Sequence, residues 1–447
     1  MKFRLSIAAL ALFALLAAPA FADFGATIDN SSSFTKEDET DFVQEDTLTV
    51  WASALLGQFL RFDAAAQAKV AIDDPHFYAD IDKLTLSGDI PAAEPGKPRF
   101  AFDLGKFFQS DFSSVVLAQP TAGLRLAFTY PAAQMKLALG YTGLNNKNAT
   151  SLVVSRLDAL DLADDDAYFA SPRFIGSATV AFPELFARQS LTLSAIVQED
   201  LRAQFDTVIE EGEEVFNPTG GGTVDTQYWG LGLTGPLASS VYYDLYGYLG
   251  TGRTLTFEDD DQSTTGQAYR YEPILAYLFG GSIRYYRPAF YKSSASLKFA
   301  FASGDADQIG YLEGNAKGNS GAFIPLAEGI FGLAFTPQIS NLVVAELSYS
   351  MKPFAAFRDS LVSSLQTGVK VTPFFKLAEG PLSDATVDPS AGSGYLGTEL
   401  DGIVNLRPYS DLGLGLSLGL FIPNGGAFVD GFDSPWFTGE FTFSFSF

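Results

Sequence analysis

The chain has 447 residues, no cysteine and one histidine, and its formal net charge is −24. The absence of cysteine excludes disulfides and leaves few ligands for zinc, and the acidic balance argues against a nucleic-acid partner. Hydrophobic residues make up 47% of the chain, yet after the N-terminus no apolar run approaches the roughly 18 residues of a spanning helix. High apolar content without helical spans favours a closed β-barrel, the other structure that satisfies the backbone inside lipid.

The N-terminus has the pattern of a bacterial export signal. Lys2 and Arg4 precede an apolar run over residues 5–18, and Ala20 and Ala22 form an A-x-A cleavage site. We therefore predict a signal peptide at residues 1–22 and a single outer-membrane β-barrel at residues 23–447, in a diderm bacterium. Residues 23–46 are polar and acidic, and either a first strand or a mobile N-terminal arm is compatible with them.

Stretches of about ten residues alternate between apolar and polar side chains along the rest of the chain, which is typical of tilted membrane strands. Residues 124–130 and 135–141 read as a hairpin joined by a short turn. Further strands are predicted near residues 48–54, 64–72, 77–86, 100–104, 174–182, 191–197, 227–233, 241–249, 277–285, 295–301, 342–350, 396–406, 412–422 and 437–447. With weaker candidates included, we expect an antiparallel barrel of about 18 strands (16–18), an even number.

The predicted connections alternate in length and charge. Residues 131–134 and 182–188 are short turns, whereas residues 157–166, 199–222 and 258–261 are long or acidic. Short turns on the periplasmic side and long loops outside are characteristic of these barrels. The carboxylates of the acidic loops could bind divalent cations, although none has the spacing of a dedicated calcium loop, and a solvated, self-repelling loop is the alternative.

Charged residues on otherwise apolar strands are predicted to line the lumen, because an Arg or Lys facing lipid at mid-depth costs roughly 2–4 kcal/mol. The acidic candidates are Asp103, Asp244, Glu346, Glu399, Asp401 and Glu440, and the basic ones are Lys69, Arg125, Lys136, Arg284 and Lys298. Two roles are open for this mixed-charge set. The charges either pair and keep the lumen wet and rigid, or form a constriction that selects solutes, in which case Glu399 and Asp401 would favour a cation.

The last eleven residues, 437–447, place phenylalanines on one face of a strand and Thr, Ser and Glu440 on the other, and the chain ends on Phe447. We expect the aromatic face to meet lipid and Phe447 to act as the assembly signal. The predicted partners are therefore outer-membrane lipid, periplasmic chaperones and the barrel-assembly machinery.

Two stretches resemble the alginate-export porin family. Residues 395–401 (Tyr-Leu-Gly-Thr-Glu-Leu-Asp) lead to the glycine-rich residues 413–425, which close on Phe-Ile-Pro-Asn-Gly, and residues 301–305 read Phe-Ala-Ser-Gly-Asp. The resemblance implies a monomeric barrel of around 18 strands with a selective pore. A channel for a polyanion such as alginate is expected to have a basic lumen, however. This chain has 28 Lys and Arg against 52 Asp and Glu, which makes alginate itself an unexpected cargo.

These features predict a passive outer-membrane channel for small hydrophilic solutes or for an oligosaccharide or polysaccharide. The alternative is a surface-exposed barrel that serves only as a platform for an adhesin or antigen. With His76 as the one histidine and no cysteine, we expect no catalytic site, no resident metal and no cofactor.

Overall fold

The computed structural model describes residues 22–37, 40–72, 77–94, 96–164, 166–202, 222–259, 267–316, 318–329, 331–357, 360–392 and 394–447. Residues 1–21 of the predicted signal peptide, His76 and most of the acidic stretches 199–222 and 258–261 lie outside these ranges. Between residues 256 and 270 only the backbone of the strands is described.

Eighteen strands form one sheet, and each is antiparallel to its neighbours in the chain. The first nine are β1 (Ala22–Lys36), β2 (Thr40–Leu56), β3 (Leu60–Ala71), β4 (Phe77–Ile90), β5 (Arg99–Ser110), β6 (Ala118–Thr129), β7 (Gln134–Tyr141), β8 (Arg173–Phe186) and β9 (Gln189–Asp200). The second nine are β10 (Asp225–Ala238), β11 (Val241–Asp259), β12 (Gln267–Arg287), β13 (Ser293–Ala302), β14 (Leu342–Met351), β15 (Gln366–Lys376), β16 (Gly394–Tyr409), β17 (Leu412–Pro423) and β18 (Trp436–Ser446).

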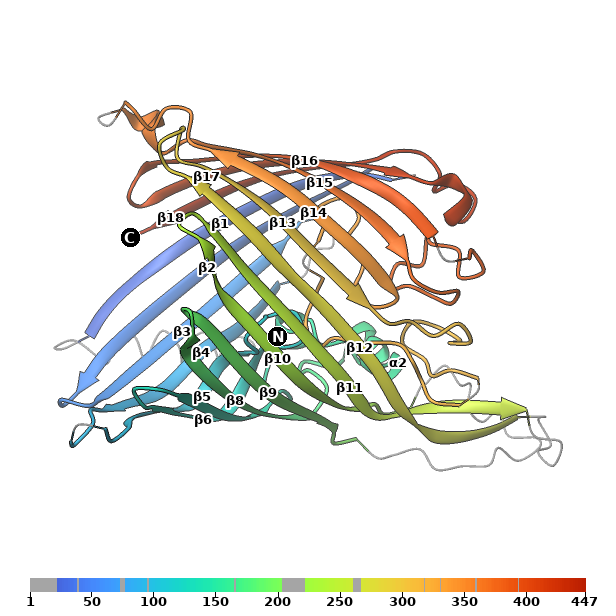
Figure 1. The fold of residues 1–447 in the computed structure, drawn as a ribbon, viewed down its shortest axis with the longest axis horizontal. Coiled ribbons are helices and arrows are strands. Elements are labelled where there is room, and N and C mark those ends of the chain that lie inside the picture. The colour runs from blue at the N-terminus through green and yellow to red at the C-terminus, as the bar shows by residue number, and fades with distance from the viewer. Residues whose placement is uncertain are drawn as a thin grey trace.

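The sheet closes because β18 pairs with β1 (Figure 1). The register runs from Thr27 opposite Ser446 to Lys36 opposite Phe437, so neither end of the sheet remains as an open edge. The predicted antiparallel barrel is confirmed, with the number of strands that the alternation indicated. Residues 22–36 form its first strand, which decides between the two readings of the N-terminal stretch.

One strand, β15, was not predicted from the sequence. β15 contains Pro373, and a proline inside a run of alternating residues argues against a strand because it lacks the N–H of the ladder. In the structure Pro373 faces Thr398 of β16, and the register shifts directly after it, between Phe374 and Phe375. The irregularity accommodates the proline near the end of the strand.

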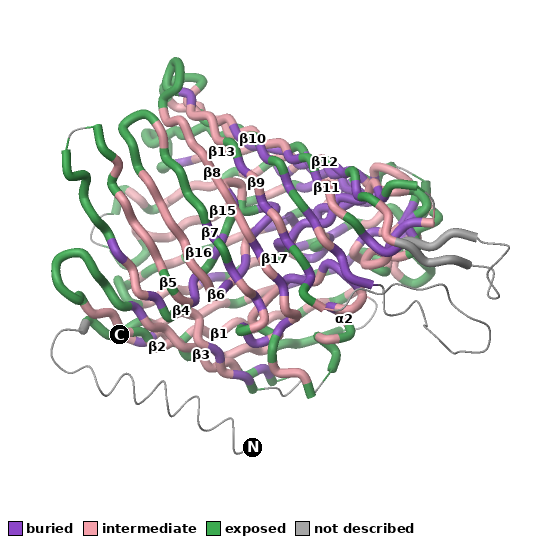
Figure 2. The backbone as a smooth tube through the Cα atoms, turned by 90° about the horizontal axis from the view of Figure 1, so that it is seen from below, coloured by how far each residue is buried: buried purple, intermediate pink, exposed green. Residues whose placement is uncertain are grey.

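Alternation sorts the side chains of each strand onto two faces. On β17, Leu416, Leu418 and Leu420 are exposed, whereas Phe421 on the opposite face is fully buried. On β18, Phe441 is 45% exposed and Trp436 only 1%. Apolar side chains therefore cover the outside, and the buried residues gather inside, toward the end that carries the long connections (Figure 2).

The two ends of the barrel differ in the length of their connections. At one end, residues 57–59, 187–188, 239–240 and 410–411 are tight turns, and the longest connection there is residues 352–365. At the other end lie the segments 142–172, 303–341 and 377–393. From β5 onward the expected alternation of short turns and long loops is present.

In the part of the chain that the structure describes, helical structure is confined to connections. The helix α2 (Arg156–Ala163) and the short 3₁₀ turn η1 (Lys147–Ala149) lie between β7 and β8, and the turns η3 (Leu361–Ser364) and η4 (Gly425–Ala427) lie in later connections. None of the helices in the described ranges is long and apolar enough to cross a membrane.

Candidate channel and its constriction

The connection between β13 and β14, residues 303–341, crosses the inside of the barrel. The backbone N–H of Leu326 donates to the carbonyl of Val116, between β5 and β6, at 2.7 Å. Further along the same connection, Phe335 stacks on Phe421 of β17 with ring centroids 4.6 Å apart. The connection between β5 and β6 is far from β17 in the strand order, so a segment that contacts both must pass through the interior. We call residues 303–341 the inner loop.

Aromatic packing holds the inner loop in place. Phe335 is fully buried and contacts four aromatic residues of the barrel wall and of the connection before β18, namely Phe374, Phe421, Phe428 and Trp436. Phe323, also fully buried, packs edge-on against Tyr228 of β10 at 5.6 Å. Burial of large aromatic side chains is the main stabilising contribution available to a segment without regular structure.

Glu399 of β16 fixes the polar part of the inner loop. Its carboxylate accepts hydrogen bonds from three successive backbone N–H groups, those of Leu333, Ala334 and Phe335, the last two at 2.9 Å. Gly332, with φ of +81°, supplies the left-handed turn that brings these groups together. A carboxylate that receives several N–H groups is strongly held, and Glu399 has no exposed surface.

The inner face of β17 makes room for this contact. A Cβ atom at Gly419 would lie 3.2 Å from the Cβ of Leu333 and 3.1 Å from a carboxylate oxygen of Asp401, tighter than ordinary packing. Asp401 is 5% exposed, and its carboxylate has no hydrogen-bond partner within the described part of the chain. The glycine-rich strand lets the inner loop lie flat against the wall and over Asp401.

A second connection, residues 111–117 between β5 and β6, also folds into the barrel at the end that carries the long connections. Asp111 accepts from the N–H of Leu117 at 2.8 Å and from the hydroxyl of Tyr248 on β11 at 2.5 Å. Phe112 stacks on Tyr248 with centroids 5.3 Å apart. Since the inner loop bonds to Val116 of this segment, the two connections form one body inside the barrel.

A buried ionic network holds α2 at the rim. Arg173 at the start of β8 lies 2.8 Å from Asp158 of α2 and 2.9 Å from Asp200 at the end of β9, and Arg202 lies 2.7 Å from Asp158. Burial favours the neutral carboxyl group, but the two guanidinium groups outweigh it and lower the pKa of Asp158 from its ordinary value of 3.8. An ion pair from Arg156 to Glu313 joins α2 to the inner loop.

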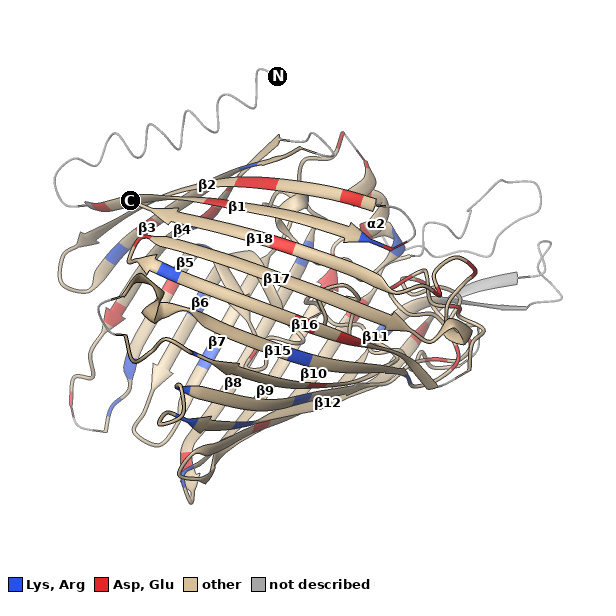
Figure 3. Cartoon of the chain, turned by 90° about the horizontal axis from the view of Figure 1, so that it is seen from above, with Lys and Arg blue, Asp and Glu red and all other residues tan. Residues whose placement is uncertain are grey.

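Most of the predicted lumen charges occur in ion pairs between neighbouring strands. Figure 3 shows that both acidic and basic residues occur on many strands of the wall. The pairs are Asp103–Arg125 at 2.7 Å, Asp244–Arg284 at 2.8 Å, Glu346–Lys298 at 3.5 Å and Lys69–Glu45 at 2.5 Å. Glu440 accepts from the hydroxyl of Ser31 at 2.9 Å, and Lys136 makes no ion pair with any described residue. Whether these side chains line the path of a solute stays a prediction.

Two ionic partners were not anticipated. Glu45 lies in the stretch whose conformation was left open, and Lys370, 3.4 Å from Glu346, lies on the unrecognised β15. Glu399 and Asp401 lie on one face as expected, but both are buried under the inner loop, and a role in selecting cations stays a prediction. No group of three or more acidic or histidine residues suited to a metal ion occurs in the described ranges.

No protein-family model and no curated protein sequence matches this chain. Solved structures do. OccK3 (OpdO) of Pseudomonas aeruginosa is 15% identical, with a TM-score of 0.56 over 95% of this chain and 96% of that chain. A BenF-like porin from Pseudomonas fluorescens Pf-5 is 9% identical, with a TM-score of 0.57 over 95% and 98%. The chain has the porin fold.

A third similar structure is that of P. aeruginosa OccK2 (OpdF) in complex with glucuronate, 12% identical, with a TM-score of 0.54 over 95% of this chain and 96% of that chain. The similarity covers nearly the full length of each porin barrel, so no large part of this chain stands apart from it. At these identities the likeness concerns the fold alone.

Proposed function

We propose that the protein is a passive outer-membrane channel for small hydrophilic solutes and that the inner loop sets its width. The observation that carries the proposal is the crossing of a closed 18-stranded barrel by residues 303–341, which are anchored by Glu399 and by aromatic packing. A barrel of this size encloses a water-filled passage unless connections fold in and narrow it.

The other features are consistent with this function. Apolar side chains on the outer face suit lipid, and paired charges on the opposite face keep an interior polar without a large field of one sign. In this proposal residues 1–22 direct export, the short turns face the periplasm, and the long connections lie outside the cell. The glucuronate complex of OccK2 shows that one protein with this fold binds a small polar solute.

Oligosaccharide or polysaccharide passage is a narrower form of the proposal, suggested by the resemblance of residues 395–425 to alginate-export porins. The balance of 28 basic against 52 acidic residues speaks against a polyanion as cargo. Transport requires no catalytic group and no cofactor.

Conductance in a planar lipid bilayer tests the proposal. Purified, folded protein should give discrete open-channel steps. A protein that is folded and inserted but electrically silent would overturn the channel and would favour the adhesin or antigen platform.

A further inference from the structure

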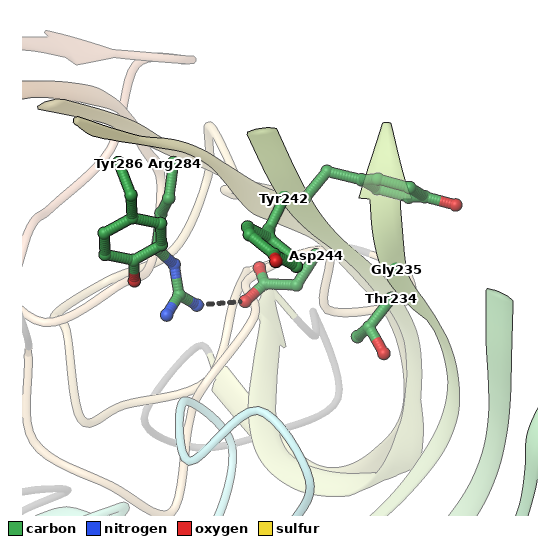
Figure 4. A pocket seen from close by; sticks show the side chains of 7 residues that line it. Thr234, Gly235, Tyr242, Asp244, Arg284 and Tyr286 are labelled. Atoms are coloured by element: carbon green, nitrogen blue, oxygen red, sulfur yellow. Dashed lines mark hydrogen bonds and ion pairs between the residues drawn. The ribbon is translucent and has the colours of Figure 1, made fainter. Parts of the chain in front are cut away.

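A cavity of about 470 Å³ opens on the wall formed by β10, β11 and β12, near their short turns. Its volume is within the range of small-molecule sites, roughly 300–1,000 Å³. It is lined by Thr234, Gly235, Tyr242, Tyr243, Asp244, Arg284 and Tyr286 (Figure 4). None of these residues belongs to the inner loop or to its contacts, so the cavity is separate from the constriction.

The charged residues and two of the tyrosines of the cavity lie on the inner face of the barrel, whereas Tyr243 alternates to the opposite face. Tyr242 and Asp244 share one face of β11 with Tyr248, which hydrogen-bonds to Asp111 of the inward β5–β6 connection. Arg284 lies directly opposite Tyr242 in the register of β11 and β12. A solute that passes the constriction would therefore meet this wall before it reaches the short-turn end.

The charged groups of the cavity neutralise each other. Arg284 donates from Nη2 to Asp244 at 2.8 Å and from Nε to Ser282 at 3.1 Å. The side chains of Arg284 and Asp244 are 49% and 32% exposed, so both present free hydrogen-bonding positions to a solute. An anion at this place would be repelled by Asp244 and a cation by Arg284, whereas adjacent donors and acceptors suit hydroxyl groups.

Two tyrosines supply the apolar part. Tyr242 and Tyr286 contact each other edge-on, with centroids 5.9 Å apart and planes at 68°, and both are more than 40% exposed. A tyrosine combines an apolar ring with a polar hydroxyl, which suits a molecule that has a C–H face and a rim of hydroxyl groups.

We infer that this cavity is a wall subsite for a neutral, ring-shaped polyhydroxylated solute, a sugar or a cyclic polyol. The inference rests on the proposed channel function and names a solute class for it. Hydroxyl groups would bridge the Arg284–Asp244 pair, and the ring would rest on Tyr242 and Tyr286.

Saturation-transfer NMR on the full chain in detergent, with myo-inositol, glucose and glucuronate as probes, tests the inference without requiring transport. We expect the two neutral probes to bind more tightly than glucuronate. Tyr286→Ala and, separately, Arg284→Gln should weaken their binding about tenfold, a change of the size expected when a packed or hydrogen-bonded partner is lost. Tyr285→Ala is the matched control, because this neighbouring tyrosine is 45% exposed and points to the opposite face.

Preference for glucuronate, no binding of either neutral probe, or equal weakening by Tyr285→Ala would overturn the subsite. Bilayer recordings on the same preparations separate its failure from that of the channel. Open-channel steps without sugar binding would leave the channel standing and remove the subsite. Silent protein that still binds myo-inositol through Tyr286 and Arg284 would remove the channel and keep the site.

Discussion

Glu399 is the residue on which the constriction depends most. It accepts from three N–H groups of the inner loop, of which those of Ala334 and Phe335 are buried, and an N–H group left buried without a partner costs about 1–3 kcal/mol. The charged carboxylate also makes stronger hydrogen bonds than a neutral group would make in the same place.

Glu399→Gln should loosen the inner loop without preventing barrel formation, because the amide has one acceptor oxygen and places an NH₂ group against the remaining donors. We expect larger and noisier single-channel currents, by about 1.5-fold to twofold in conductance if the passage widens by part of a side chain. Glu440→Gln is the control, since Glu440 receives one hydrogen bond, from Ser31. Identical traces for the Glu399 variant and the wild type would contradict the anchoring role.

Asp158 makes the rim sensitive to strong acid. Its pKa is lower in the folded protein than the 3.8 of the unfolded chain, so its stabilising contribution is complete above about pH 3.8 and is lost as pH falls through the folded pKa. Hydrogen exchange at α2, corrected for intrinsic rates, should therefore be constant from about pH 7 to pH 5 and should accelerate below about pH 4.

The strand amides should stay protected over the same range, because the ladder of backbone hydrogen bonds does not titrate. Asp158→Asn should expose α2 at every pH and remove the acid step. Protection of α2 that does not decline at all below pH 3.8 would show that the stability of α2 is not linked to the ionisation of Asp158.

At the level of elements, the alternation of apolar and polar residues predicted most strands, because a strand with one apolar face has an apolar residue at every second position. It failed at β15, where Pro373 interrupts the pattern. It left β1 undecided because Asn30 and Ser32 interrupt the apolar face that Phe24, Ile28 and Phe34 form. β1 is identified as a strand by its pairing with β18, which the sequence pattern does not show. The alternation within a single strand was likewise enough to predict which charged residues face the lumen. Their ion-pair partners, such as Lys370 and Glu45, could be identified only once the pairing register of neighbouring strands was known.

β18 also carries a prediction about assembly. Phe447 donates its N–H to the carbonyl of Ala26 and accepts from the N–H of Ala26, each at 2.9 Å, so the last residue completes the seam with β1. Deleting Phe447 should reduce the heat-modifiable, folded fraction in the outer membrane severalfold and leave export to the periplasm intact. Deleting both Phe447 and Ser446 should enlarge the defect, and normal insertion of the single deletion would contradict the role of Phe447.

For the whole molecule, the interior could not be deduced from the sequence. The phenylalanines of the inner loop, Phe323, Phe331 and Phe335, lie in none of the strands or helices of the described ranges, and their burial depends on wall residues far away in the chain. Loop composition drew attention to the acidic segments, and nothing in the sequence pattern distinguished residues 306–341. The closure of the sheet into a barrel could be predicted from the sequence. The packing inside the barrel could not, because it depends on contacts between residues that are far apart in the chain.

The conductance of a variant in which residues 306–338 are replaced by a short Gly-Ser linker tests the central claim most directly. β13 and β14 are paired neighbours, so a short linker can join them without disturbing the wall. We expect a folded barrel whose single-channel conductance exceeds that of the wild type by at least about twofold, because the segment that fills the interior is gone. A folded, inserted variant with wild-type conductance would show that the inner loop does not set the width of the channel.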